Sequence, residues 1–415
     1  MEREPDVLIL GAGVIGLCCA YYLLQSGHSV TLLDQGAPGS GSSHGNCGTI
    51  TPSHAPPLAK PGMVGQALKW MLEPAAPFYV KPSLDPALLS WLLGFASRCA
   101  WPAFERGLKA KAALLKVSRG AIESLCRDER LDCEFAARGH LTVFKSQQAL
   151  DAFAWWPKAL AEVGTVVEAL DGKALRQREP ALREDVIGGF DTPGDAQFRP
   201  DRFVSELARR VVEMGGVIET GFEIAALERN GETVRVQGPR GTRGGRHGVL
   251  ALGAWSPLLS RSIGVRIPVQ PGKGYSITTE PPARAARVPI VCREKSIAIT
   301  PWRSTYRIGS TMEFAGYDAS LNRRRIEQLV ASASEYLVEP IGSTRLEEWY
   351  GWRPMSVDDV PIIGAAPGFR RLWLATGHGM LGMSMSAGTG QLIEAMVTGR
   401  ASAIDPTPYS PERFA

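Results

Sequence analysis

The first 34 residues alternate between short apolar runs and a helical pattern. Residues 6–10 form a nearly apolar run that ends at a glycine turn, residues 11–16, and residues 17–25 have the composition of a packed helix. A second apolar run, residues 29–33, ends at Asp34. Short apolar runs that alternate with a helix are typical of parallel strands joined by a crossover. The pattern therefore predicts a strand-turn-helix-strand unit.

The glycine turn gives this unit a candidate chemistry. Gly11 would make the tight turn, Gly13 would let the backbone approach a pyrophosphate, and Gly16 would let helix and strand pack closely. The N-terminus of the helix supplies N–H groups and partial positive charge to phosphates. Asp34 can accept hydrogen bonds from the two hydroxyls of an adenosine ribose. These features predict an adenine dinucleotide site, and leave NAD and FAD as alternatives.

Further along the chain the pattern changes from helical to strand-like and back. The region of residues 63–126 is mostly helical and contains Trp70, Trp91 and Trp101, for which a buried helical face is favoured over membrane docking. The remaining predicted elements are a strand at 139–144, a helix at 201–214, a strand at 217–220, alternation over 222–227, an antiparallel sheet over 268–349 with one helix near 323–337, a strand at 372–375 and a closing helix at 383–396.

Length favours two domains, because 415 residues exceed the ~250–300 that one core usually serves. The predicted fold class is α/β (α+β), with a Rossmann-like nucleotide domain assembled from separated segments. A second domain would carry the antiparallel sheet and a helical insertion. The predicted boundaries are 1–56, 194–264 and 351–403 for the nucleotide domain, 57–193 and 265–350 for the substrate domain, and 404–415 for a C-terminal tail.

Charge and cysteine content exclude several classes of function. The net charge is +4, and no dense basic stripe with interleaved aromatics occurs, which argues against a nucleic-acid partner. The seven cysteines form no CxxC pair, which fits reduced thiols rather than a disulfide framework or a metal site. No apolar stretch approaches the ~20 residues of a membrane span. We expect a cytoplasmic protein that could contact the inner face of a membrane peripherally.

Several motifs resemble those of one enzyme family. They are Asn46-Cys47-Gly48, Gly194-Asp195-Ala196, Gly253-Ala254-Trp255-Ser256, Gly351-Trp352-Arg353-Pro354 and Thr376-Gly377-His378-Gly379-Met380-Leu381-Gly382-Met383. Over nearly its whole length the chain resembles FAD-dependent amine and amino-acid oxidoreductases such as D-amino-acid oxidase, glycine oxidase and sarcosine oxidase. It looks most like the bacterial D-amino-acid dehydrogenases. In these relatives threonine and tryptophan often stand at the places of Met380 and Met383, a departure that concerns substrate preference more than flavin binding.

The resemblance implies FAD as cofactor, held noncovalently. His44 raises the question of covalent attachment, but it lies in a dehydrogenase-like loop. The helix that starts near Met383 would direct its N-terminus at the flavin and stabilise negative charge there. The implied cofactor contacts are Gly11, Gly13, Val14, Ile15, Gly16, Asp34, Gln35, Ser42, Ser43, Asn46, Gly48, Thr49, Ile224, Gly253, Trp255, Gly379, Met380, Leu381, Gly382 and Met383.

The resemblance also implies substrate contacts. Arg353 matches the arginine that holds the substrate carboxylate in related oxidases, and a guanidinium suits that bidentate contact; the alternative is a salt bridge with Asp358 or Asp359. Tyr275 could line the pocket or pack in the sheet. His54 and His378 lie near flavin loops and are further candidates, although a lone histidine is more often structural.

The implied reaction is oxidation of the Cα–N bond of a D-amino acid or cyclic imino acid, with hydride transfer to flavin N5. D-Proline and cis-4-hydroxy-D-proline are candidate substrates, and a quinone or another acceptor would take the electrons. Two alternatives stay open. One is an oxidase of the glycine or sarcosine type that uses oxygen, and the other is a flavoprotein subunit or redox-dependent binding partner without its own turnover.

Overall fold

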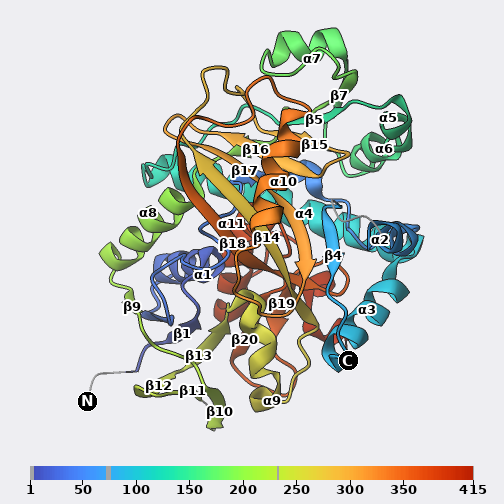
Figure 1. The fold of residues 1–415 in the computed structure, drawn as a ribbon. Helices are drawn as coiled ribbons and strands as arrows, with labels where there is room; N and C mark the ends of the chain where they lie inside the picture. The colour runs from blue at the N-terminus through green and yellow to red at the C-terminus, as the bar shows by residue number, and fades with distance from the viewer. Residues whose placement is uncertain (1–3, 72–75, 231–232, 415) are drawn as a thin grey trace.

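The computed structural model describes residues 4–71, 76–230 and 233–414 (Figure 1). Its first layer is a six-stranded sheet in the order β19-β20-β13-β1-β2-β9. All neighbours are parallel except β19 and β20. The strands are β1 (Val7–Leu10), β2 (Val30–Leu33), β9 (Val217–Glu219), β13 (His247–Leu250), β19 (Ile362–Ala365) and β20 (Leu372–Thr376). The sheet thus draws on chain segments more than 300 residues apart.

The two faces of this sheet are covered by different elements. Val7 and Ile9 pack into a core shared with helices α1 (Val14–Gln25), α4 (Trp101–Asp128), α8 (Pro200–Glu213) and α11 (Gly382–Thr398). Leu8 and Leu10 belong to a separate core with the small sheet of β10 (Ala226–Asn230), β11 (Thr233–Gly238) and β12 (Gly241–Gly245). Successive residues of a strand point to opposite faces. The uninterrupted apolar run of β1 is therefore explained by burial on both sides.

A nine-stranded sheet forms the second layer, drawn in the upper half of Figure 1. Its order is β18-β14-β17-β16-β15-β5-β7-β6, and β4 pairs with β17. Helix α10 (Arg323–Ser334) covers it. The strands are β4 (Phe78–Val80), β5 (Leu141–Phe144), β6 (Glu168–Asp171), β7 (Gly188–Asp191), β14 (Val269–Thr279), β15 (Ile290–Cys292), β16 (Ile297–Pro301), β17 (Tyr306–Phe314) and β18 (Arg345–Ser356).

The remaining elements connect or flank the two sheets. They are β3 (Thr49–Ile50), β8 (Ala196–Gln197), η1 (Pro52–His54), α2 (Met63–Met71), α3 (Pro86–Arg98), α5 (Gln147–Ala152), α6 (Trp155–Glu162), α7 (Gly172–Arg178), η2 (Gly253–Leu259), α9 (Ser260–Ile263), η3 (Thr407–Tyr409) and η4 (Pro411–Phe414).

Most predicted elements lie where the sequence pattern put them, and three points need correction. The helical region over residues 63–126 is interrupted by β4, and its residues 72–75 lie outside the described residues. Trp91 is buried as expected, but Trp101 is 58% exposed, so a buried face does not account for it. The alternation over 222–227 forms a strand only from Ala226 onward. The exact domain boundaries stay a prediction.

Candidate active site

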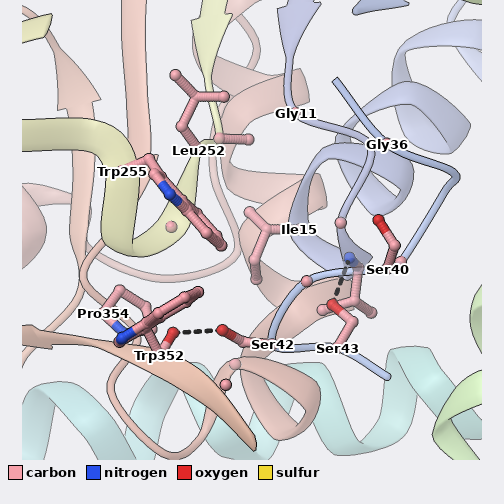
Figure 2. A pocket seen from close by; sticks show the side chains of 18 of the residues that line it. Gly11, Ile15, Gly36, Ser40, Ser42, Ser43, Leu252, Trp255, Trp352 and Pro354 are labelled. Atoms are coloured by element: carbon pink, nitrogen blue, oxygen red, sulfur yellow. Dashed lines mark hydrogen bonds between the residues drawn. The ribbon is translucent and has the colours of Figure 1, made fainter. Parts of the chain in front are cut away.

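A cavity of about 680 Å³ runs between the two layers. One end is lined by the turn after β1 and by Asp34 and Gln35, which follow β2. The other end reaches Arg353 on β18 and the start of α11. In Figure 2 the glycine turn and the serine loop face Trp255 and Trp352 across the cavity. The cavity therefore joins the nucleotide turn to the arginine expected to bind substrate.

The glycine turn has the geometry that its sequence predicts. Gly11 has a φ of +105°, and a Cβ there would come within 2.6 Å of the Ala251 carbonyl oxygen. A Cβ on Gly16 would overlap the Gly11 carbonyl oxygen, so Gly16 permits close contact of helix and strand. Gly13 lines the cavity, and a Cβ on it would meet only the Ser43 hydroxyl, at 3.5 Å. Gly13 is thus the glycine whose bare backbone faces the ligand space.

Asp34 has a structural role in addition to the predicted contact with the ribose. Its Oδ2 accepts a hydrogen bond from the Ala12 N–H at 2.7 Å, and its Oδ1 accepts one from the Gly36 N–H at 2.8 Å. The carboxylate thus ties the turn after β1 to the loop after β2. A carboxylate has about four acceptor sites, so Asp34, which lines the cavity, keeps acceptor capacity for ribose hydroxyls.

The serine loop closes one side of the cavity. Ser43 Oγ accepts a hydrogen bond from the Val14 N–H at 3.1 Å, at the N-terminus of α1 (Figure 2). Ser42 Oγ donates to the carbonyl oxygen of Trp352, which lies on β18. The Trp352 ring meets the Trp255 ring edge to face at 5.6 Å. The loop therefore connects the nucleotide layer to the aromatic wall on the opposite side.

Arg353 lies half-buried in the cavity without a carboxylate partner. Its Nη1 donates to the Thr311 carbonyl oxygen at 2.6 Å, and burial lowers the pKa of its guanidinium. The alternative salt bridges are wrong: Asp358 pairs with Arg413 at 2.8 Å, and Asp359 pairs with Lys111 at 2.6 Å. Among the described residues Arg353 forms no ion pair. Its charge is therefore available to an anionic ligand.

A β-bulge positions this guanidinium. Opposite Gly274 on β14, strand β17 carries two residues, Thr311 and Met312, because the register shifts between Lys273 and Tyr275. Thr311 has a φ of +68°, which is unusual for a β-branched residue. A Cβ on Gly274 would overlap the Arg353 guanidinium. Bulges often aim a side chain near an active site. Here the bulge supplies the acceptor, the Thr311 carbonyl oxygen, and Gly274 opposite it leaves the space for Arg353.

His378 lies at the same end of the cavity, at the turn before α11. Burial lowers the pKa of its imidazole to about 3, so the ring is neutral near pH 7. Its Nε2 lies 2.9 Å from Thr389 Oγ1 on α11. Gly382 and Met383, the first residues of α11, also line the cavity. The N-terminus of α11 therefore contributes partial positive charge to this end of the cavity.

Other predicted residues lie elsewhere. Tyr275 is 1% exposed in the core of the large sheet, and its hydroxyl donates to Glu313 Oε2 at 3.2 Å, so the packing alternative describes it. His54, Met380 and Leu381 line a second cavity rather than the first. Gly48, with a φ of +66°, packs on Phe198 and Trp302. Thr49 forms β3, and its carbonyl oxygen accepts a hydrogen bond from Ser384 Oγ at 3.0 Å.

The first cavity unites most of the predicted cofactor contacts and several residues that the sequence did not single out. The predicted residues on its wall are Gly11, Gly13, Val14, Ile15, Asp34, Gln35, Ser42, Ser43, Asn46, Ile224, Gly253, Trp255, Gly379, Gly382 and Met383. Further wall residues include Gly36, Ser40, Leu252, Leu258, Trp349, Tyr350 and Pro354. In the sequence, the run of mainly small residues over positions 36–48 is the signal that could have identified Gly36 and Ser40.

The cavity wall fits FAD. The bare glycine backbone at Gly13 and the start of α1 suit a pyrophosphate, Asp34 suits a ribose, and Ile224 lies at the nucleotide end. Aromatic and glycine residues at the other end suit a flat ring system. His44, the residue that raised the question of covalent flavin attachment, is hydrogen-bonded to Glu347. Its Nε2 lies 2.7 Å from the Glu347 Oε1, and this hydrogen bond raises the pKa of the His44 imidazole.

Comparison with known proteins identifies the family. Residues 6–396 match the model of the FAD dependent oxidoreductase family, and the chain belongs to it. The cofactor is therefore FAD, and the protein is an FAD-dependent oxidoreductase. Within the described residues, no helix has the length and apolar character needed to cross a membrane.

Individual relatives support this assignment over the full chain. A D-amino acid dehydrogenase from Allorhizobium ampelinum is 36% identical over 417 residues, covering 99% of this chain and 98% of the relative. One from Phenylobacterium zucineum is 37% identical, covering 97% and 96%. Among solved structures, glycine oxidase from Geobacillus kaustophilus has a TM-score of 0.80 at 21% identity, covering 98% of each chain. The similarity to glycine oxidase shows that the two proteins share a fold.

Proposed function

We propose that the protein oxidises the Cα–N bond of a D-amino acid or a cyclic D-imino acid, with D-proline and cis-4-hydroxy-D-proline as candidate substrates. The observation that carries the proposal is Arg353, a guanidinium in the same cavity as the nucleotide turn that forms no ion pair with any described residue. Two relatives that cover nearly the whole chain are named D-amino acid dehydrogenase. Together these observations favour a substrate with a carboxylate next to the bond that is oxidised.

In this proposal the residues of the chain bind and orient the substrate. Arg353 holds the carboxylate through two hydrogen bonds, and the Thr311 carbonyl oxygen fixes the guanidinium. His378 is neutral near pH 7, so it adds no second positive charge beside Arg353. When bound, FAD would supply the redox chemistry, as the two-electron acceptor for the hydride that leaves Cα.

The product is an imino acid whatever the side chain. An acyclic imino acid hydrolyses to a 2-oxo acid and ammonia, whereas proline gives a cyclic imine. The substrate amine enters in its neutral form, because its nitrogen lone pair must support the developing C=N bond.

We further propose a quinone or another acceptor for the electrons, and peripheral contact with a membrane. The support is a set of exposed apolar side chains, here called the apolar patch, on α2, on α3 and in the segments beside α3. Helices α2 and α3 lie on the same side of the ribbon in Figure 1. The members of the apolar patch are Val64, Leu68, Met71, Leu84, Leu89, Leu93 and Trp101. Exposed Lys69 and Lys81 lie in the same segments. Apolar side chains accompanied by lysines are typical of helices that lie on an anionic membrane surface.

An anaerobic screen tests the function. The FAD-loaded enzyme is mixed without oxygen with D- and L-amino acids, both proline isomers, cis-4-hydroxy-D-proline and N-methyl amines, and the flavin absorbance is followed. We expect D-amino or D-imino acids to bleach the flavin. Bleaching by L-isomers alone or by N-methyl amines alone would contradict the proposal, and no bleaching by any compound would favour a binding partner without turnover.

A second experiment distinguishes the acceptor. The reduced enzyme is exposed to air or to a soluble quinone, and peroxide and reoxidation rates are measured. A dehydrogenase is expected to reoxidise much faster with the quinone. Rapid peroxide formation in air would instead assign an oxidase of the glycine or sarcosine type.

A further inference from the structure

A second cavity, of about 150 Å³, lies on the other side of the turn that precedes α11. His378 and Gly379 of this turn and Gly382 and Met383 of α11 line the first cavity, whereas Met380 and Leu381 of the turn line the second. The rest of its wall is mainly apolar and aromatic, and Phe153, Trp155 and Trp156 are part of it. The function proposed above assigns no role to this space.

Two cations in the second cavity lack an acidic partner. The Lys60 ammonium lies 4.2 Å from the centre of the Trp155 ring, and the Arg293 guanidinium lies 4.8 Å from the centre of the Phe153 ring. Both side chains are half-buried. In the part of the chain that the structure describes, neither side chain has a hydrogen bond or an ion pair with a protein group. Their donors are therefore available to a ligand.

The carboxylates near these cations bind other groups of the protein. Asp359 pairs with Lys111 at 2.6 Å and also accepts from the Leu58 N–H at 2.9 Å. The Glu294 carboxylate accepts hydrogen bonds from the Lys145 and Ser146 N–H groups and from the Tyr336 hydroxyl. Glu294 keeps its negative charge and acts on Arg293 from beyond ion-pair distance. Among the described residues, the second cavity thus holds two cations without an ion-pair partner.

The effect of these charges is visible in the neighbouring groups. Burial lowers the pKa of Lys60, and the positive charge of Arg293 lowers it further. Burial also lowers the pKa of His54 to about 4, and Arg293 and Lys111 add to this shift. His54 is therefore neutral near pH 7 and adds no charge of its own. An anion in the cavity would relieve the repulsion between Lys60 and Arg293.

We propose that the second cavity binds the carboxylate of a small organic acid between Lys60 and Arg293. A guanidinium matches the planar geometry of a carboxylate, and an ammonium adds a second charge-assisted hydrogen bond. The aromatic walls suit a short carbon chain, and 150 Å³ accommodates a group of only a few heavy atoms. The carboxylate could belong to the side chain of a dicarboxylic substrate or to a separate organic acid.

Site-resolved acetylation of lysines tests the proposal without using turnover. The FAD-loaded enzyme is treated with acetic anhydride at constant ionic strength, with succinate or with chloride, and the labelling rate of each lysine is measured by mass spectrometry. We expect succinate to slow labelling of Lys60 several-fold. The exposed Lys116 on α4 is the internal control and should label at an unchanged rate.

Variants assign the protection to this cavity. Arg293→Met should abolish protection of Lys60, Arg293→Lys should retain part of it, and Lys116→Met should leave it intact. Equal Lys60 labelling with succinate and with chloride in the wild-type enzyme would overturn the proposal. Protection that persists in Arg293→Met would also overturn it, because succinate would then act from another site such as Arg353.

Kinetics then separate the two sources of the carboxylate. If it belongs to the substrate, Arg293→Met should lower kcat/KM for D-glutamate about tenfold or more relative to D-leucine. If it belongs to a separate acid, succinate should change D-leucine turnover in the wild-type enzyme but not in Arg293→Met. The labelling result decides whether the site exists, so it stands even if the enzyme proves to use other substrates.

Discussion

The guanidinium of Arg353 on β18 occupies the space that Gly274 on β14 leaves beside it. The residue directly opposite Arg353 is Gly272, so the side chain leans along β14 to reach Gly274. Any larger residue at position 274 would overlap the guanidinium. The position of the expected carboxylate anchor therefore depends on a missing Cβ on the neighbouring strand.

The first prediction follows from this contact. Gly274→Ala should displace the guanidinium and raise KM for amino acids about tenfold or more, because a charge-assisted hydrogen bond depends on its geometry. We expect kcat to change less. Gly120→Ala on α4 is the matched control, since a Cβ there meets no atom within 4 Å. It should leave KM unchanged and stabilise the helix by about 0.5–1 kcal/mol. An unchanged KM in Gly274→Ala would disprove the positioning role.

Two glycines of the nucleotide turn should respond differently to alanine. Gly13→Ala leaves the protein contacts ordinary, at 3.5 Å from Ser43 Oγ, but puts a methyl group into the ligand space. We expect normal thermal stability without FAD and a large loss of FAD affinity. Gly16→Ala forces the methyl group onto the Gly11 carbonyl oxygen and should lower the stability of the cofactor-free protein as well. Calorimetry and flavin titration measure the two effects, and equal stability losses would contradict the assignment.

The stability of the protein should depend on pH through His378. Its folded-state pKa is about 3, below the usual ~6.5, so the unfolded chain takes up this proton first as the pH falls. The free energy of unfolding should therefore fall below about pH 6.5, by up to ~1.4 kcal/mol per pH unit from this residue. His378→Gln should reduce the slope of the unfolding free energy against pH by the contribution of about one proton. The same slope in both proteins, measured by denaturant titration between pH 4 and 7, would show that His378 is not buried in its neutral form.

The apolar patch predicts binding to lipid vesicles. Leu68→Glu combined with Leu93→Glu replaces two exposed apolar side chains by acids and should abolish co-sedimentation with anionic vesicles. Val212→Glu on α8 is the control, because Val212 is also exposed but lies on a helix outside the patch. If the wild-type protein does not sediment with the vesicles, the membrane proposal fails.

Local pattern was sufficient to predict the nucleotide turn, because Gly11, Gly13 and Gly16 act within six residues. Most elements followed from apolar periodicity in the same way. The contact of Arg353 with Gly274 could not be predicted, since it depends on a bulge between β14 and β17. From the sequence we expected Met380 to lie beside the flavin, whereas in the structure Met380 lines the second cavity. Neither register nor the direction of a turn can be read from periodicity.

The most direct test of the account is the anaerobic reduction of bound flavin in wild type, Arg353→Lys and Arg353→Met. Substrate concentration is varied with the best D-amino acid and with the corresponding amine that lacks the carboxylate. We predict that both variants bind FAD normally but need about 10- to 100-fold more amino acid for half-maximal reduction, with Arg353→Met the more affected. The small activity with the amine should be unchanged. Equal concentration dependence for amino acid in all three proteins would contradict the central claim that Arg353 binds the substrate carboxylate.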